Sequence, residues 1–428
     1  MHRVISVLEH ETVPILSDAD AARLAGNSDA VRAWLTEAEA NALLRRSERG
    51  PRICERTSAG IRFSQFCGLL SEAKFILEIL PKTGLDDLRQ PGEMRAARQA
   101  LLDMLSCARS LTLHVGNDVG QEAVRAPLLE VFIQAFLNCI LVQARRGLLH
   151  RYLEQSENLR SAKGRINVHR HLRTNITRPH LLHCDFDEFT VDNPYNRAIR
   201  AALDISRPWL SSTTGQRLWL ECHARFADIT PTRMHAEDVA ALRRDRTTRH
   251  YEPALDWCER LLSLLNPSLR SGGSCAPGLL FNMNRLFEDY VHYLERQDAM
   301  PDEQVHAQGP ARPLARAALV DVFQLKPDVT VWRRPKGAGG AGVVRIIDAK
   351  WKRLQPNDNR WGVSPADIYQ LLAYAVRYGC TELELVYPAP TGWASDAVPP
   401  SFVIDNTSLT APVHISVRML NLAGPARL

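Results

Sequence analysis

Apolar residues recur at intervals of three and four positions along several stretches of this sequence, which places them on one face of an α-helix. The clearest case is NMNRLFEDYVHYLERQ (282–297), where an apolar stripe alternates with charged positions. Two other helices have start signals, because Asn193 and Ser364 each precede a proline and can cap a first turn. The predicted helices are 17–26, 28–46, 127–154, 282–297 and 364–378, one that begins after Asn193, and more helix up to about residue 265.

Four shorter stretches are rich in apolar and β-branched residues and read as strands. KFILEILPK (74–82) comes early, whereas LKPDVTVWRR, VVRIIDAKWK and TELELVYPA come late in the chain. The segment 266–278 is dense in Pro, Gly and Ser, which is typical of a linker. We therefore predict an α+β N-terminal domain over 1–265 and an α/β C-terminal domain over 279–428, in which helices flank a central mixed sheet.

The composition is that of a globular protein. The chain has 428 residues, 45% of them hydrophobic and 24% charged, which is enough for two or three domains with proper cores. The longest uncharged apolar run, 131–144, contains Gln and Asn and is shorter than the ~20 residues of a membrane span. No signal peptide is recognisable, and the nine cysteines include no CxxC pair. We expect a cytoplasmic protein with reduced cysteines and no membrane segment.

Two motifs suggest chemistry that their surroundings do not support. GAGGAG (337–342) matches the letters GxGxxG, yet a strand follows it where a dinucleotide site needs a helix. His180, His183 and Cys184 suggest a metal site, but no second ligand pair is in view, so packing and hydrogen-bonding roles are favoured. Because a Walker lysine motif is also missing from the sequence, we do not expect this chain to hydrolyse nucleotides itself.

Charged residues interrupt the late strands at positions that would bring them together. Asp348 and Lys350 point to one face of their strand, while Ala349 and Trp351 point to the other. If this strand pairs with the preceding one through the glycine loop, Asp328 approaches Asp348 at one end of the sheet. Two facing carboxylates repel unless a cation lies between them, and hard oxygen ligands suit Mg²⁺. A lysine beside them could orient or deprotonate a water, or stabilise charge on a phosphate.

The spacing PD, 19 residues, DAK is the signature of the PD-(D/E)xK nuclease superfamily, whose fold is restriction-endonuclease-like. The following helix carries Gln370 and Tyr374 four positions apart on one face, as in the QxxxY motif of RecB-like members. Glu288, on the preceding helix, is a candidate for an extra metal-ligand carboxylate. The alternative is a surface strand on which Asp348 and Lys350 form an ordinary ion pair.

A basic stretch lies in the middle of the chain, LRSAKGRINVHRHLRTN (159–175). The net charge of +5 is only a mild excess, so the clustering of charge says more than the total. Two interpretations of this stretch stay open, namely a solvated surface ribbon and a DNA-binding surface. The side chains considered for DNA contact are Lys163, Arg165, Arg170 and Arg173.

Taken together, these segments resemble the McrC family, the nuclease subunits of McrBC modification-dependent restriction systems specific for 5-methylcytosine. The resemblance covers most of the chain and is least clear at its N-terminal end. It rests on segments in the expected order: LEILPK, RGLLHRYLEQSENLRSAKGRINVHRHLRTN, HCDFDEFTVDNPYNRAIRAAL, NMNRLFEDYV, LKPDVTVW, IIDAKWK and DIYQLLAYA.

The resemblance implies a type IV restriction endonuclease subunit whose N-terminal domain docks on a hexameric McrB-like AAA+ GTPase. The partner would bind GTP, read modified cytosine in double-stranded DNA and translocate. This chain would stimulate the GTPase and make a Mg²⁺-dependent double-strand cut. Residue by residue, Asp328 and Asp348 match the metal-binding acids and Lys350 the catalytic lysine, while Gln370 and Tyr374 match the QxxxY pair.

Two other functions stay open. A free-standing RecB-like nuclease would use the same acids, although the N-terminal half is larger than such an enzyme requires. A non-catalytic assembly factor would use the nuclease fold only as an anchor, and the intact acid pair and lysine argue against it. The basic stretch 160–173 is a candidate for contact either with McrB or with DNA phosphates.

Overall fold

The computed structural model describes most of the chain. The described residues are 3–20, 33–72, 75–83, 91–108, 127–265, 279–333, 342–355, 359–389, 398–405, 409 and 411–422. The predicted linker 266–278 and nearly all of the GAGGAG loop lie outside the described residues. The predicted helix 17–26 is described only up to residue 20.

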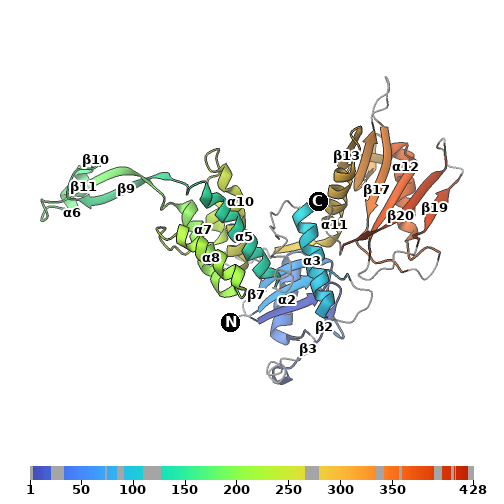
Figure 1. The fold of residues 1–428 in the computed structure, drawn as a ribbon, viewed down its shortest axis with the longest axis horizontal. Helices are drawn as coiled ribbons and strands as arrows, with labels where there is room; N and C mark the ends of the chain where they lie inside the picture. The colour runs from blue at the N-terminus through green and yellow to red at the C-terminus, as the bar shows by residue number, and fades with distance from the viewer. Residues whose placement is uncertain are drawn as a thin grey trace. The chain divides into compact units, whose positions relative to one another are not determined.

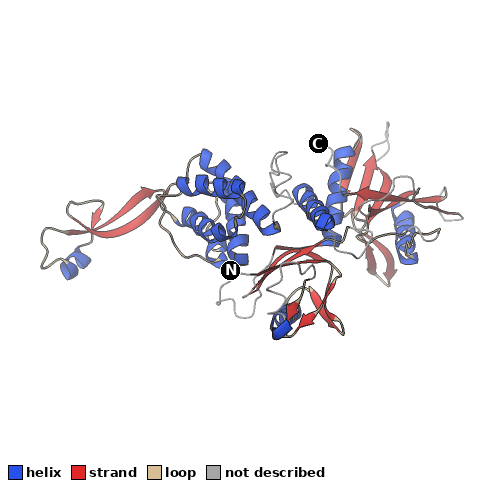
Figure 2. Cartoon of the chain, turned by 60° about the horizontal axis from the view of Figure 1, so that its bottom comes forward, coloured by secondary structure: helices blue, strands red, loops and turns tan. Residues whose placement is uncertain are grey.

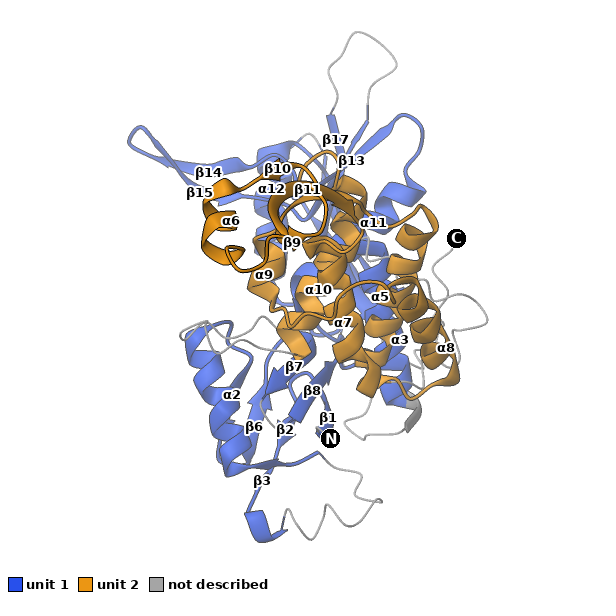
Figure 3. Ribbon diagram, turned by 90° about the vertical axis from the view of Figure 1, so that its left-hand side faces the viewer, with its two compact units in different colours: residues 1–113, 280–428 blue, residues 114–279 orange. Residues whose placement is uncertain are grey.

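Two compact units divide the chain, and they interleave along the sequence (Figure 3). Unit 1 consists of Met1–Leu113 and Leu280–Leu428, and unit 2 of His114–Leu279. The predicted N-terminal domain 1–265 is therefore distributed over both units, although the predicted start of the C-terminal domain falls at a unit boundary. The predicted division into residues 1–265, a linker over 266–278 and residues 279–428 stays a prediction.

The first part of unit 1 contains small sheets and two helices. Their bounds are β1 Arg3–Leu8, β2 Thr12–Val13, β3 Ile15–Leu16, β4 Leu35–Thr36, α2 Glu37–Arg49, β5 Cys54–Thr57, β6 Gly60–Phe63, β7 Phe66–Glu72, β8 Phe75–Leu80, α3 Pro91–Ala108 and β12 Leu279–Asn282. The main sheet has the order β1-β8-β7-β12. All of β8 is buried between a parallel and an antiparallel neighbour, which explains the apolar run of the predicted strand 74–82.

The helix predicted from residue 28 begins later than expected. Residues 33–36 are not helical, and α2 begins at Glu37. A capping box fixes this start, because Thr36 Oγ1 accepts a hydrogen bond from Glu39 N at 3.3 Å and Glu39 Oε2 accepts one from Thr36 N at 2.8 Å. The prediction was wrong over these residues because the cap outweighs the apolar spacing around it.

The C-terminal part of unit 1 is built on a six-stranded sheet. The bounds are α11 Met283–Asp298, β13 Glu303–Ala307, β14 Arg312–Ala317, β15 Val320–Leu325, β16 Val329–Arg333, β17 Gly342–Ala349, α12 Pro365–Tyr378, β18 Glu382–Ala389, β19 Ser401–Ile404 and β20 Val413–Asn421. The strand order is β13-β16-β17-β18-β20-β19. β16 and β17 are antiparallel while β17 and β18 are parallel, so the predicted mixed sheet is confirmed. The strands β13, β14, β15, β19 and β20 were not predicted.

The helices α11 and α12 pack on opposite faces of this sheet (Figure 2). Ile346 of β17 belongs to the same core cluster as Leu371 of α12. Its neighbour Arg345 bonds instead to Glu295 of α11, and adjacent residues of a strand point to opposite faces. α12 has the predicted N-cap Ser364, α11 is capped by Asn282, and Gly379 ends α12 in the left-handed conformation at φ 67°.

Unit 2 combines a helical body with an arm that is built on a three-stranded sheet (Figure 1). Its elements are α5 Leu128–Arg145, β9 Arg151–Leu159, β10 Arg165–Ile166, α6 Val168–Thr174, β11 Leu182–Thr190, α7 Pro194–Ser206, the short 3-10 helix η1 Arg207–Trp209, α8 Thr213–Arg225, α9 Ala236–Ala240, η2 Arg249–Tyr251 and α10 Glu252–Leu265. Among the described helices, α5 alone is long and apolar enough to cross a membrane, and 78% of that stretch is buried in the protein. It packs against α8 and α10, as expected of a core helix.

The helix predicted over 127–154 is wrong in its last part. α5 ends at Arg145, and Gly147 has a positive φ of 96°, which does not continue a helix. β9 then pairs with β11 in antiparallel register from Arg151↔Thr190 to Leu159↔Leu182. Residues 151–190, called the arm below, carry β10 and α6 at the end away from the helical body (Figure 1).

Asn193 fastens both ends of the arm to α7. Its side chain is fully buried, and Oδ1 accepts hydrogen bonds from the backbone N of Tyr195 and Asn196, which confirms the predicted N-cap. Nδ2 donates to the carbonyl oxygen of Leu149 at 2.7 Å and of Thr190 at 3.3 Å. Leu149 precedes β9 and Thr190 ends β11, so one side chain holds the two strands where they leave the body.

Replacing Asn193 with alanine is expected to destabilise unit 2 by about 2–4 kcal/mol, because it removes a helix cap and leaves buried backbone groups unpaired. The measurement is the free energy of unfolding from a urea titration followed by circular dichroism. The control is Asn167→Ala, which removes the half-buried cap of the short helix α6 and its bond to Asp185, and should cost about 1 kcal/mol. Equal losses in the two variants would contradict the special role of Asn193.

Candidate active site

The predicted pairing of the two late strands brings Asp328 and Asp348 to one end of the six-stranded sheet. The register pairs Val329 with Ile347, which places the preceding Asp328 beside the following Asp348. Asp328 Oδ2 accepts a hydrogen bond from the backbone N of Ala349 at 2.8 Å. The loop after β13 closes over Asp328, because Gln308 N donates to its carbonyl oxygen at 2.6 Å.

Lys350 lies next to this acid pair, on the same face of the strand as predicted. Its Nζ is 2.6 Å from Asp348 Oδ2, and the Asp348 side chain is only 1% exposed. Burial lowers the pKa of Lys350, but the charge and hydrogen bond of Asp348 more than compensate, so the net pKa is raised. Lys350 is therefore a protonated, positively charged ammonium at neutral pH.

The acids repel one another in a poorly solvated setting. Burial raises the pKa of Asp328, and the charges of Asp348 and Glu288 raise it further. Burial also raises the pKa of Asp348, although Lys350 lowers it in part. For Glu288 the causes of the raised pKa are burial, then the charges of Asp289 and Asp348. A cation bound between these acids would relieve their mutual repulsion and favour their ionised forms.

Gln370 and Tyr374 orient the lysine from α12. Gln370 Oε1 accepts a hydrogen bond from Lys350 Nζ at 3.1 Å, and Gln370 Nε2 donates to Tyr374 OH at 2.7 Å. The tyrosine hydroxyl in turn donates to the backbone oxygen of Lys326 at 3.3 Å. This chain of hydrogen bonds returns to the residues just before Asp328, so α12 links the two halves of the site.

Two features of the site could not be recognised in the sequence. Lys352 Nζ contacts Asp367 Oδ2 at 2.8 Å, and Tyr387 OH donates to the same oxygen at 3.3 Å. Asp367 lies in the first turn of α12. Trp351 Nε1 donates to Glu9 Oε1 at 2.8 Å, across almost the whole length of the sequence. No sequence signal pointed to Glu9.

The residues fit a single divalent cation. The part of the chain that the structure describes contains no group of three or more His, Cys, Asp or Glu side chains arranged to hold a metal. It does contain the acid pair, and Asp348 Oδ1 is buried without a hydrogen-bond donor among the described residues. Carboxylate oxygens are the ligands that Mg²⁺ prefers, and a two-acid site leaves coordination positions for water and substrate.

The basic residues of the predicted DNA-binding set lie on the arm of unit 2, whereas the acid pair belongs to unit 1. Lys163 is exposed and forms an ion pair with Glu188 at 3.1 Å. Arg170 donates to Ser156 Oγ at 2.9 Å. Arg165 on β10 and Arg173 on α6 are exposed.

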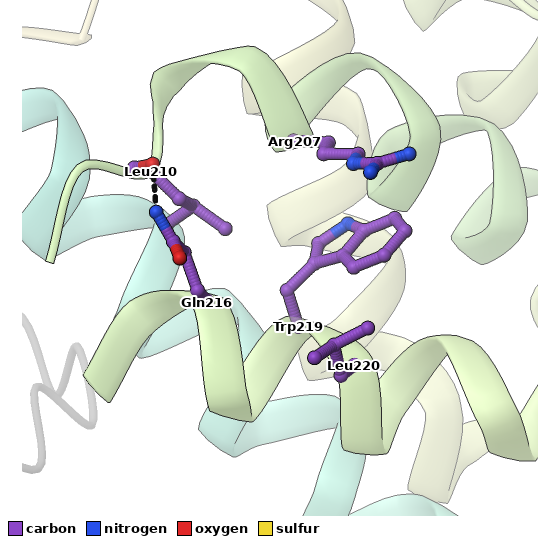
Figure 4. Close-up of a pocket in the computed structure, with 5 residues that line it drawn as sticks. All are labelled: Arg207, Leu210, Gln216, Trp219 and Leu220. Atoms are coloured by element: carbon purple, nitrogen blue, oxygen red, sulfur yellow. Dashed lines mark hydrogen bonds between the residues drawn. The ribbon is translucent and has the colours of Figure 1, made fainter. Parts of the chain in front are cut away.

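Unit 2 also contains a cavity of about 260 Å³ beside α8 (Figure 4). The described residues that line it are Arg207, Leu210, Gln216, Trp219 and Leu220. The Arg207 guanidinium lies 5.1 Å from the centroid of the Trp219 ring, and Gln216 donates to the carbonyl oxygen of Leu210. None of these residues is an acid or a nucleophile, so the cavity offers no chemistry comparable to the acid pair.

Comparison with known proteins identifies a family for this chain. The sequence model of the family described as "McrBC 5-methylcytosine restriction system component" matches residues 61–388. No curated protein matches the chain.

Two solved structures are similar to the chain. One belongs to an assembly of Thermococcus gammatolerans McrB AAA+ hexamers with bound McrC, at 17% identity and a TM-score of 0.68, covering 98% of this chain and 96% of that one. A chain of the McrBC complex from the same organism has 20% identity and a TM-score of 0.46, covering 69% and 88%. The first likeness supports the mixed α/β fold over nearly the full length. With most of the sequence matched by the family model, the chain belongs to the family of McrBC 5-methylcytosine restriction system components.

Proposed function

We propose that this chain is the nuclease subunit of a McrBC-type restriction system and hydrolyses phosphodiester bonds of DNA. The buried acid pair beside a charged lysine carries the proposal. The part from residue 279 onward would be a restriction-endonuclease-like domain, with the site at the ends of β16 and β17. Asp328 and Asp348 would hold Mg²⁺, with the Ala349 carbonyl and Glu288 as further oxygen donors.

The chemistry divides between the ion and the lysine. Bound Mg²⁺ would supply Lewis-acid stabilisation of the negative charge on the scissile phosphate. Water adds its oxygen to phosphorus and gives up a proton to the solvent, the bond from phosphorus to the leaving sugar oxygen breaks, and that oxygen takes up a proton from the solvent. Lys350, whose Nζ lies 2.6 Å from Asp348 Oδ2, would stabilise charge on the phosphate and orient the attacking water. Gln370 keeps the ammonium pointed at the site.

The proposed partner is a McrB-like AAA+ GTPase hexamer in the cytoplasm. The solved assembly of McrB hexamers with bound McrC supports this choice, since the chain shares a fold with a protein of that complex. GTP would bind to the partner, which would also read the modified cytosine in double-stranded DNA. This chain would stimulate GTP hydrolysis and make the cut.

Cleavage is expected only when the chain, the partner, GTP and Mg²⁺ are combined on plasmid DNA that contains 5-methylcytosine. The measurement is the conversion of supercoiled to linear plasmid on a gel, with unmethylated plasmid as the control. Equal cutting without the partner would favour a free-standing nuclease. No cutting in the complete mixture, with GTP hydrolysis still stimulated, would favour a non-catalytic assembly factor.

The exposed surface at the end of the arm is more typical of a protein-docking site than of a DNA-binding site. Val168 and Leu172 lie one turn apart on α6, Ile176 follows in the turn after this helix, and the three are 61%, 56% and 76% exposed. The exposed Arg165 and Arg173 flank them. Phosphate contacts need cations but no apolar surface, whereas exposed apolar clusters with a polar rim mark protein interfaces.

Replacing Leu172 and Ile176 together with aspartate is therefore expected to weaken binding to the GTPase partner by about tenfold or more. The measurement is the dissociation constant by biolayer interferometry, with circular dichroism to verify folding. The matched control is Arg165→Glu with Arg173→Glu, which should change partner affinity less. Unchanged partner affinity in the apolar variant, with weaker DNA binding in the charge-reversed one, would assign the arm to DNA instead.

A further inference from the structure

The catalytic strand is connected to the N-terminal sheet of unit 1 through one tryptophan. Trp351 follows Lys350 directly and points to the opposite face, where its ring lies 5.3 Å from that of Phe287 on α11. There its Nε1 donates to Glu9 Oε1 at 2.8 Å. The residue after β1 and the residue after the catalytic lysine are therefore bonded directly.

Glu9 is held rigidly where the central strands of the N-terminal sheet end. Its backbone N donates to Leu80 O at 2.8 Å, at the end of β8. Its Oε1 also accepts a hydrogen bond from the backbone N of Lys82 at 3.0 Å. The residue is only 2% exposed, so both the backbone and the carboxylate of Glu9 are fixed to the same sheet.

This carboxylate is costly to bury. Oε2 has no hydrogen-bond partner among the described residues, and the nearest ion-pair contact is His10 Nε2 at 4.0 Å. Burial raises the pKa of Glu9 to about 7, and the hydrogen bonds of Lys82 and Trp351 with the charge of Arg353 offset this only in part. A buried acid that is incompletely satisfied contributes little to stability, so its contact with Trp351 points to a different role.

Besides the contacts of Lys350 Nζ and the packing of Trp351 on Phe287, four contacts hold the short segment that carries Lys350. β17 ends at Ala349, whose backbone N bonds to Asp328. Lys350 N donates to Val386 O at 2.9 Å, and Lys352 Nζ contacts Asp367. The fourth contact is Trp351 with Glu9. Three of these come from the C-terminal part of unit 1, and only Glu9 comes from the N-terminal sheet.

We propose that Glu9 is a positioning residue for Lys350, acting through Trp351, so that the N-terminal sheet forms part of the scaffold of the nuclease site. Loss of this contact leaves residues 349–352 less ordered while the acid pair stays in place. A shift of the ammonium away from the phosphate slows the chemical step more than it weakens DNA binding. The activity readout rests on the proposed nuclease function, whereas the order of the segment can be measured without it.

The first test is hydrogen exchange of the backbone amides of 349–352 in the full chain, without DNA or partner. Glu9→Ala is expected to speed exchange at Lys350 by about tenfold or more. Glu9→Gln keeps an amide oxygen as acceptor for Trp351 and should stay within about twofold of the natural protein. The matched control is Glu78→Gln, which alters another buried acid of the same sheet, paired with Arg98, and should leave 349–352 unchanged. Unchanged exchange in Glu9→Ala, or an equal rise in Glu78→Gln, would overturn the proposal.

The second test is DNA cleavage by the complex with the partner and GTP. Glu9→Ala and Trp351→Phe, which keeps the ring against Phe287 but removes the donor, are each expected to lower kcat about tenfold with little change in KM. The double variant should lose no more than the worse single one, because both remove the same bond. Additive losses, or unchanged kcat in both single variants, would contradict the proposal. If the natural protein cuts no DNA, the proposed function fails, and hydrogen exchange still decides whether Glu9 orders the segment; Trp351→Phe provides that test if Glu9→Ala does not fold.

Discussion

Asp348→Asn is expected to lower DNA cleavage by at least about 10³-fold while the protein stays folded, because metal-ion stabilisation of the transition state is worth several kcal/mol. The substitution keeps the volume of a buried side chain and removes only the charge that Mg²⁺ needs. It also removes one of the charges that raise the pKa of Asp328. The protein should therefore keep its thermal stability to within a few degrees in the absence of metal.

A second measurement separates loss of metal binding from loss of chemistry. A ligand that binds only the folded state raises the melting temperature, so Mg²⁺ should stabilise the natural protein and not the Asp348→Asn variant. The matched control is Asp321→Asn, which removes an exposed acid of the same unit that pairs with Arg316. Cleavage within tenfold of the natural protein, or an unchanged Mg²⁺ effect on melting, would show that Asp348 does not hold the ion.

Lys350→Ala is expected to reduce cleavage by about 10²-fold or more, the loss typical when one group that stabilises developing charge is removed. Its pH dependence provides a more specific test. Lys350 lowers the pKa of Asp348, so without the lysine this pKa rises further. Because Mg²⁺ binds the ionised carboxylate, metal-induced stabilisation should appear only at a higher pH than in the natural protein.

The control for this prediction is Lys352→Ala, two positions further along the chain and bonded to Asp367. Lys352→Ala should change cleavage by less than about tenfold, because Lys352 pairs with Asp367 of α12 and not with the acid pair. Cleavage is compared at saturating GTP, and the melting temperature is followed between acidic and mildly basic pH. Equal effects of the two lysine variants would mean that general positive charge, and not the position of Lys350, supports the reaction.

The sequence was most informative where a local signal and the long-range pairing agree. β16 and β17 are connected through a glycine-rich segment, and their alternation already predicted that Asp348 and Lys350 share a face. The caps Asn193 and Ser364 predicted helix starts because a side chain and the next few backbone groups determine them.

Prediction failed where distant contacts decide the structure. The stretch 151–154 continues the apolar spacing of a helix, yet it becomes a strand because β11, about thirty residues later, pairs with it. β14 and β15 were not predicted because their side chains are exposed or half-buried, so the sequence has no alternating apolar pattern there. The bond between Glu9 and Trp351 joins residues 342 positions apart, and the motif beside Trp351 gives no signal for a partner near residue 9.

The interleaving of the two units has a consequence for synthesis of the chain on the ribosome. Unit 2 is one continuous segment and can fold as soon as it emerges, whereas unit 1 needs both the first 113 residues and those after 279. At translation rates of about 5–20 residues per second, the strand β7 waits on the order of ten seconds or longer before its neighbour β12 exists. During that time an apolar sheet has an open edge, so the newborn N-terminal part is the segment most in need of a chaperone.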